Sequence, residues 1–143
     1  MKTSEAFRIR LADWESDQPA LRAIREQVFV YEQSVPRAME WDEFDSVSQH
    51  VLAEAEGRII GTGRLLPDGH VGRMAVLPAW RERGVGSALL RVLLDMARDA
   101  GHERVMLNAQ VLAMPFYRRF GFETKGGEFL EAGIPHIAMS RRI

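Results

Sequence analysis

The residues with the clearest chemical meaning in this chain form a glycine-rich turn, Arg81-Glu82-Arg83-Gly84-Val85-Gly86-Ser87, at the start of a segment with helical periodicity. The start of a helix leaves backbone N–H groups without partners and carries a partial positive charge. Gly84 and Gly86 remove side chains that would keep an anion away from those groups. The turn therefore indicates a phosphate-binding site at a helix N-terminus.

Two other kinds of phosphate-binding loop do not fit this turn. A P-loop needs a Lys followed by Ser or Thr after its last glycine, whereas Gly86 is followed by Ser87 and Ala88. The dinucleotide fingerprint needs a third small residue where the chain has Leu89. An ordinary helix start that contains glycine stays open as the alternative.

The segments on either side of the turn predict a strand before it and a helix after it. Segment 71–76 reads as a strand, which Pro78 cannot continue because proline has no amide hydrogen. After the turn, apolar residues recur at helical spacing up to the stop at Gly101, and they are Val85, Ala88, Leu89, Val92, Leu93, Met96, Ala97 and Ala100. We expect a strand, a glycine turn and a long amphipathic helix.

The remaining segments predict a mixed sheet with helices on both faces. Consecutive hairpins dominate one half of the chain and crossovers the other, so the order is not that of a doubly wound fold. Ser16 or Asp17 is expected to cap a helix opened by Pro19, with Leu21, Ile24 and Val28 facing inward. The other expected elements are a first strand at 7–11, a loop or short helix at 32–48, a hairpin of 51–55 with 59–66, a strand at 105–109, a short helix at 114–120 and two strands within 122–140.

Composition limits the classes of function. At 143 residues, with 46% hydrophobic and 27% charged residues, the chain is expected to be one soluble domain, 1–143. A net charge of −1 gives no electrostatic reason to expect nucleic acid or an anionic membrane as partner, and a cytoplasmic location is expected. The chain has no cysteine, which excludes thiolate metal sites and a cysteine acyl-enzyme. The four histidines are far apart, so no metal site is predicted.

Two blocks in sequence order carry a family resemblance. Arg81-x-x-Gly84-x-Gly86 after Met74-Ala75-Val76 closely resembles the acetyl-CoA pyrophosphate loop of the GNAT superfamily of N-acetyltransferases. Asn108-Ala109-Gln110, followed by segment 113–122 with its Tyr117 and Phe-Gly-Phe exit, resembles the later cofactor motif of the same superfamily. Segments 29–33 and 133–139 resemble the small ElaA-type subgroup, so the resemblance covers nearly the whole chain.

The resemblance implies a fold and a cofactor. The fold would be α+β (mixed α/β), with a mixed central sheet of about seven strands and helices on both faces. The strands at 71–76 and 105–109 would splay apart to admit the pantetheine arm. Acetyl-CoA would be the cosubstrate, with no metal, and the implied cofactor-binding residues are Met74, Ala75, Val76, Arg81, Glu82, Arg83, Gly84, Val85, Gly86, Ser87, Asn108, Phe116 and Tyr117.

Acetyl transfer from a thioester to an amine needs a deprotonated amine, a polarised carbonyl and a proton for the departing thiolate. Main-chain groups of Met74 and Val76 are candidates to bond the pantetheine amides and polarise the carbonyl. The resemblance matches Tyr117 to the family tyrosine that donates a proton to the sulfur, and a core tyrosine is the alternative. Asn108 could bond a pantetheine amide or the incoming substrate.

The general base is the weakest assignment from sequence. Many relatives carry a glutamate on the strand before the loop, where this chain has Gly72 and Arg73. His136 is the candidate base, because an unperturbed imidazole with a pKa near ~6.5 accepts protons at neutral pH. A structural histidine, or a base that acts through water, stays open.

Acidic residues gather in the irregular segment after the first helix. Glu40, Asp42 and Asp45 are expected to bind a protonated amine substrate, with Trp41 and Phe44 as cation–π faces. A solvated acidic loop is the alternative. The function expected overall is direct acetyl transfer to a primary amine of a small molecule or protein. The oligomeric state is left open, with a homodimer as one possibility. A non-catalytic acyl-CoA sensor is the rival, and a nucleotide-binding module is the weakest option.

Overall fold

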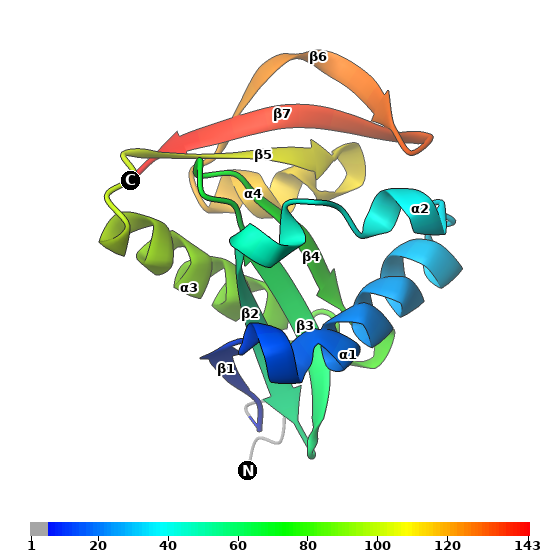
Figure 1. The fold of residues 1–143 in the computed structure, drawn as a ribbon. Helices are drawn as coiled ribbons and strands as arrows, with labels where there is room; N and C mark the ends of the chain where they lie inside the picture. The colour runs from blue at the N-terminus through cyan, green and yellow to red at the C-terminus, as the bar shows by residue number, and fades with distance from the viewer. Residues whose placement is uncertain (1–5) are drawn as a thin grey trace.

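Two antiparallel sheets form the centre of the computed structural model, which describes residues 6–143 (Figure 1). The first sheet has the strand order β1-β2-β3-β4 and the second has the order β5-β7-β6. All of the expected strands are present, but they are divided between these sheets. Their bounds are Arg8–Leu11 (β1), Gln49–Ala55 (β2), Arg58–Leu65 (β3), Val71–Val76 (β4), Arg104–Gln110 (β5), Glu123–Glu131 (β6) and Ile134–Arg142 (β7).

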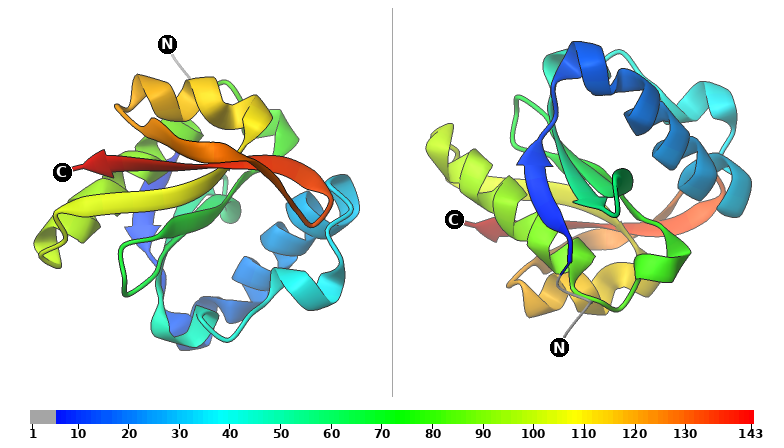
Figure 2. Two further views of the ribbon diagram at one scale, coloured as in Figure 1. Left: turned by 90° about the horizontal axis from the view of Figure 1, so that it is seen from above. Right: turned by 90° about the horizontal axis from the view of Figure 1, so that it is seen from below.

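Helices cover both faces of the first sheet (Figure 2). The helix α1 runs directly into a π-helix, η1, while α3 packs against β2, β3 and β4, and α4 lies beside β5. The helical elements are α1 (Trp14–Arg25), η1 (Glu26–Glu32), α2 (Arg37–Glu40), α3 (Val85–Asp99) and α4 (Met114–Arg119), with 3-10 turns η2 (Asp45–Val47), η3 (Pro78–Trp80) and η4 (Val111–Ala113). The prediction of a mixed fold with helices on both faces is confirmed.

The long helix α3 is held to the sheet by its apolar stripe. Leu89, Leu93 and Ala97 have no exposed surface, as the helical periodicity predicted, whereas Ala100 of the predicted stripe is exposed and the unpredicted Leu90 and Leu94 are buried. Glycines on β3 let the helix approach closely, since a Cβ at Gly63 would lie 2.8 Å from Leu93 Cδ1 and one at Gly61 would lie 3.1 Å from Leu89 Cδ1. The helix N-terminus, and the turn that precedes it, are thereby fixed at one end of the sheet.

The strands β4 and β5 touch at one end and then diverge. Within residues 6–143 the two strands share one isolated parallel bridge, His70 with Met106, supported by a 3.2 Å hydrogen bond that Met106 N–H donates to the Gly69 carbonyl. The remainder of β4 pairs with β3, and β5 pairs with β7. The predicted splay between 71–76 and 105–109 is confirmed.

A β-bulge interrupts β4 where it begins to leave β5. Ala75 pairs with Thr62 and Gly72 pairs with Arg64, so both Arg73 and Met74 lie opposite the single residue Gly63. Arg73 has a φ of 49°, a conformation that side chains other than glycine rarely adopt. The bulge therefore changes the direction of the backbone in the middle of the diverging strand.

The start of α1 was predicted wrongly. The helix begins at Trp14 with Asp13 at the N-cap, and Pro19 lies inside it. Asp17 does not cap the helix as expected, because its carboxylate accepts a 2.7 Å hydrogen bond from the Asp13 N–H and forms an ion pair with Arg10. The inward residues Leu21, Ile24 and Val28 are buried, as predicted.

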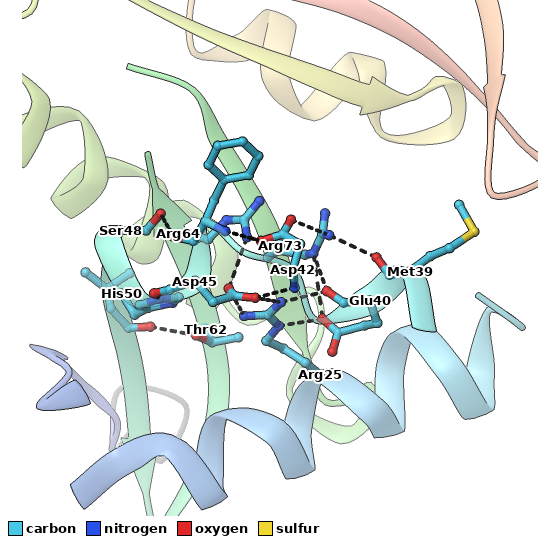
Figure 3. A network of polar contacts seen from close by, with 12 residues as sticks. Arg25, Met39, Glu40, Asp42, Asp45, Ser48, His50, Thr62, Arg64 and Arg73 are labelled. Atoms are coloured by element: carbon cyan, nitrogen blue, oxygen red, sulfur yellow. Dashed lines mark hydrogen bonds and ion pairs between the residues drawn. The ribbon is translucent and has the colours of Figure 1, made fainter. Parts of the chain in front are cut away.

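A buried ion-pair network fastens segment 37–47 to the first sheet (Figure 3). Arg25 of α1, with no exposed surface, donates from Nε to Glu40 Oε2 at 2.5 Å and from Nη1 to Asp45 Oδ1 at 2.7 Å. From β3, Arg64 Nη1 reaches Asp42 Oδ1 at 2.9 Å and Asp45 Oδ1 at 3.0 Å. From β4, Arg73 Nη2 donates to Asp42 Oδ2 at 3.1 Å.

The network corrects the prediction that Glu40 and Asp45 form an acidic surface for a cationic substrate. Glu40 is 3% exposed and Asp45 is fully buried, and each is paired with arginine. Asp42 is partly exposed but bonded to Arg64 and Arg73. The carboxylates appeared uncompensated in the sequence because their arginine partners lie on α1, β3 and β4, far away along the chain.

Asp45 is ionised at ordinary pH in spite of its burial. Burial alone would favour the neutral carboxyl group, but hydrogen bonds from Arg25 and from the Asp42 N–H, together with the charges of Arg25 and Arg64, lower its pKa from 3.8 to about 2. A carboxyl group whose pKa is lower in the folded state stabilises the fold above its unfolded pKa.

We predict that Asp45→Asn lowers the free energy of unfolding at pH 7 by about 2 kcal/mol or more, since it removes a buried charged partner from both Arg25 and Arg64 and leaves them only Glu40 and Asp42 respectively. Urea unfolding from pH 7 to pH 3 measures the effect. The difference in free energy of unfolding between wild type and variant should become smaller as the pH falls below 3.8 towards the folded pKa of about 2. The exposed control Asp99→Asn should change stability by less than about 0.5 kcal/mol. A difference in free energy of unfolding that stays constant with pH would contradict the conclusion that ionised Asp45 stabilises the fold.

Candidate active site

A cavity of about 710 Å³ occupies the gap between the diverging strands. Its wall includes the backbone of β4, the end of β5, residues of α4 and η1, and part of segment 37–47. Two candidate catalytic residues, Tyr117 and His136, both line it. The sequence-predicted residues Met74, Ala75, Val76, Arg81, Asn108, Glu40 and Asp42 also line it, whereas Asp45, Phe116 and the turn residues 82–87 do not.

The glycine-rich turn lies at the N-terminus of α3 and presents backbone rather than side chains. Gly84 is the N-cap residue with a φ of 86°, and no side chain caps the helix. At Gly86 the nearest atom to an added Cβ would be Phe116 Cζ at 3.6 Å, so the turn contacts α4 without being filled by it. The first N–H groups of α3 therefore suit an anion such as a pyrophosphate.

The other turn residues divide into backbone and side-chain roles. Val85 is 1% exposed and packs in the core, so a cofactor could meet only its main chain. Glu82 has a φ of 60°, which shapes the turn, and Arg83 stacks over Trp80 at 4.0 Å. Ser87 is half-buried on the first turn of α3.

Arg81 links the turn to η1. Its Nη1 and Nη2 each lie 2.6 Å from a carboxylate oxygen of Glu32, and its Nε donates to the Val76 carbonyl at 2.9 Å. The hydrogen bond from Arg81 lowers the pKa of Glu32. The Val76 carbonyl is thus already occupied, which leaves the neighbouring main-chain groups of β4 for a ligand.

Tyr117 projects from α4 towards the bulge of β4. Its hydroxyl lies 3.7 Å from the Met74 sulfur, and its ring packs edge-on against Phe116 and Phe122. Burial raises the pKa of Tyr117 to about 12. The hydroxyl is therefore protonated at every ordinary pH and suits a proton donor.

His136 of β7 is oriented by the backbone. Its Nδ1 lies 2.6 Å from the Ile134 carbonyl, which can only accept, so Nδ1 carries a proton, and in the neutral ring Nε2 has the free lone pair. The ring is stacked beside Phe129, and Nε2 lies 3.9 Å from Glu131 Oε2. At 6% exposed, His136 has the tautomer and the access to the cavity that a general base needs.

Six polar residues of the cavity were not predicted as site residues, and they are Gln33, Arg64, His70, Arg73, Gln110 and Glu131. Gln110 donates to the Gln33 side-chain oxygen at 2.9 Å across the gap between β5 and the end of η1. Glu131 Oε1 lies 3.4 Å from Asn108 Nδ2. Gln33 and Gln110 stand beside motif residues in the sequence, but their separation of 77 positions conceals their contact.

The described residues do not add a metal or a membrane segment to this picture. Residues 6–143 contain no group of three or more metal-ligating side chains, and none of their helices is long and apolar enough to cross a membrane.

Comparison with known proteins gives the context of this site. The sequence profile of the acetyltransferase (GNAT) domain matches residues 11–143. The uncharacterised N-acetyltransferase YjcF of Bacillus subtilis strain 168 is 39% identical over 122 residues, 82% of this chain and 87% of the relative. The ElaA protein of Escherichia coli K12 is 30% identical over 132 residues, 87% of this chain and 86% of the relative.

Solved structures agree with the sequence matches. The crystal structure of E. coli ElaA superposes with a TM-score of 0.84 at 28% identity, over 94% of this chain and 99% of that one. An acyl-CoA N-acyltransferase from Pseudomonas aeruginosa gives a TM-score of 0.84 at 31% identity, with the same coverage of both chains. Since the domain profile and these relatives each span most of the sequence, the chain belongs to the GNAT acetyltransferase family, in its ElaA-type group, and is an acyltransferase.

Proposed function

We propose that this enzyme transfers an acetyl group from acetyl-CoA directly to a primary amine of a small molecule or protein. The observation that supports the proposal most is that Tyr117 and His136, a proton donor and a proton acceptor, line one cavity. That cavity also reaches Arg81 of the glycine turn, so a ligand held by the turn could extend between the two residues.

The turn fits the pyrophosphate of acetyl-CoA, and the diverging edge of β4 fits its amide-bearing arm. Gly86 leaves the space that a phosphate oxygen needs in order to approach the N-terminus of α3. Acetyl-CoA would supply the acetyl group as a thioester. The main chain at the Met74 bulge, the part of β4 nearest to the Tyr117 hydroxyl, is the proposed partner of the thioester carbonyl.

His136 and Tyr117 then carry out one proton transfer each. The His136 Nε2 takes a proton from the attacking amine, while Nδ1–H stays bonded to the Ile134 carbonyl. As the amide bond forms and the carbon–sulfur bond breaks, the Tyr117 hydroxyl donates its proton to the sulfur. The products are the acetylated amine and the free thiol, and solvent then takes the proton from His136 Nε2 and returns a proton to Tyr117. No cysteine acyl-enzyme is available, because the chain has no cysteine.

The pyrophosphate site is tested by Gly86→Val. An added Cβ there meets Phe116 only at ordinary contact distance, so the fold should persist while the side chain fills the path of the phosphate. We expect the Kd of acetyl-CoA in calorimetry to rise at least tens-fold, about the cost of one or two charge-assisted hydrogen bonds. Gly127→Val, on exposed β6 with no atom near the added Cβ, is the control. Unchanged affinity for Gly86→Val would refute the site.

Tyr117→Phe removes the proposed acid and keeps the ring packing. We expect kcat to fall by about 10²-fold, the low end for general acid catalysis, because a thiol with a pKa near ~8.5 is already a fair leaving group. Acetyl-CoA should still bind within a few-fold. The other tyrosine of the chain provides the control, since Tyr31 is 69% exposed and Tyr31→Phe should leave kcat unchanged. Full kcat in Tyr117→Phe would make Tyr117 a packing residue.

His136→Gln tests the base. A glutamine is similar in size but takes up no proton at neutral pH, so kcat should fall on the order of 10²-fold and the acidic limb of the kcat–pH profile should disappear. His102→Gln, outside the cavity, should retain both rate and limb. If His136→Gln keeps the acidic limb, another group or a water chain deprotonates the amine.

A further inference from the structure

Two arginines in the cavity wall have more hydrogen-bond donors than the residues around them can use. Arg64 and Arg73 both line the cavity, on neighbouring strands of the first sheet. Arg64 is 5% exposed, and its Nε is buried without a hydrogen-bond partner. Among the described residues, the hydrogen bonds of Arg64 all come from Nη1, to Asp42 and Asp45. Its Nε and Nη2 therefore form a guanidinium edge with no acceptor.

Arg73 lacks acceptors at another nitrogen. Its Nε donates to the Glu40 carbonyl at 3.0 Å, and its Nη2 to the Met39 carbonyl and the Asp42 carboxylate. Within residues 6–143 its Nη1 donates no hydrogen bond. The pKa of Arg73 is lowered by burial and by the nearby charges of Arg64 and Arg25, which the acidic neighbours do not offset.

The carboxylates of the network cannot supply the missing acceptors. Glu40 Oε2 and both oxygens of Asp45 already accept from Arg25. The two oxygens of Asp42 accept from Arg64 and Arg73 respectively. The network balances Arg25, Arg64 and Arg73 against Glu40, Asp42 and Asp45 in formal charge, and its atoms without a hydrogen bond among the described residues are the donors Arg64 Nε, Arg64 Nη2 and Arg73 Nη1 and the single acceptor Glu40 Oε1.

The chemistry of those donors selects a ligand group. A guanidinium edge offers two parallel N–H groups, which match two oxygens of a carboxylate or phosphate. A cationic group would face two arginines and would find one acidic oxygen of the network, Glu40 Oε1, without a donor among the described residues, because the other carboxylate oxygens accept from arginine. This is the opposite of the cationic substrate that the sequence led us to expect.

We propose that Arg64 and Arg73 form an anion subsite in the cavity, and that the acceptor is a primary amine which also bears a carboxylate or phosphate group. The inference rests on the proposed function, because it assigns the acceptor of the same reaction. The amine would lie towards His136, and the anionic group would lie against the two guanidinium groups.

Matched amine pairs test the selectivity. Thiol release from acetyl-CoA should be measured with α-amino acids against their carboxamides, and with amino phosphates against the dephosphorylated amines. We expect the anionic member of at least one kind of pair to have a kcat/KM about tenfold higher or more, as one charge-assisted hydrogen bond would give. A preference for the amino acid over its carboxamide identifies a carboxylate as the anionic group of the acceptor. A preference for the amino phosphate over the dephosphorylated amine identifies a phosphate. Equal use of both members in every pair that turns over would overturn the subsite.

Variants connect the selectivity to Arg73. Arg73→Gln should raise the KM for the anionic acceptor about tenfold or more, with the KM for acetyl-CoA unchanged. Arg73→Lys should retain part of the selectivity. Lysine and glutamine at position 73 would both adopt the same φ of 49°, so backbone strain does not account for a difference between the two variants. Arg58→Gln, exposed in the β2–β3 hairpin, is the control. Selectivity that survives in Arg73→Gln would overturn the role of Arg73.

A binding measurement separates this inference from the proposed reaction. N-acetylglycine, N-acetylglycinamide and inorganic phosphate should each be titrated into the protein saturated with coenzyme A. Binding of N-acetylglycine or phosphate but not of the amide, lost in Arg73→Gln, would support the subsite even if no amine is turned over and the proposed function fails. Binding of the amide as tightly as the acid, or of none of these probes, would overturn it.

Discussion

The divergence of β4 from β5 is the constraint on which the rest of the site depends. Every strand edge carries N–H and C=O groups that need partners, and past the His70–Met106 bridge the facing edges of these strands do not pair with each other. The bulge at Arg73 and Met74 turns β4 further from its neighbour. A cavity with polar backbone in its wall follows from this separation, and the cavity in turn gives Tyr117 and His136 a common space.

Ion pairs, rather than apolar packing, position the other walls of that cavity. Arg25 ties segment 37–47 to α1, and Arg81 ties η1 to the turn before α3 through Glu32. The pairs of Arg25 are buried, whereas the Arg81–Glu32 pair is partly exposed. Buried pairs are costly to form and costlier still when one partner is removed, so the pairs of Arg25 define one arrangement more than they add to stability. The short helices beside the cavity, α2 and η2, have few apolar contacts of their own and depend on this arrangement.

Local patterns in the sequence predicted the elements whose stability is local. The periodicity of 85–100 predicted α3, and the turn residues at 56–58 predicted the β2–β3 hairpin, because both are set by neighbours in the chain. The network was missed since Arg25 lies 15 and 20 residues from Glu40 and Asp45. The π-helix η1 has no clear signature in the spacing of apolar residues, so it was not predicted. The contact of Gln33, at the end of η1, with Gln110 was not predicted either. Tyr117 and His136 could be proposed as catalytic residues from their motif context, but the hydrogen bond that orients His136 and the raised pKa of Tyr117 required the surrounding atoms.

The buried network also bears on how relatives of this enzyme can diverge. Replacing Arg25 alone leaves Glu40 and Asp45 charged in the interior, and replacing either acid alone leaves arginine in excess. Each single step is therefore selected against, whereas a joint exchange of both sides for apolar residues can be neutral. Changes at these positions should be inherited together across lineages, and the spacing between the first helix and segment 37–47 should resist insertion. The acceptor wall would evolve in discrete blocks while the exposed residues around it drift one at a time.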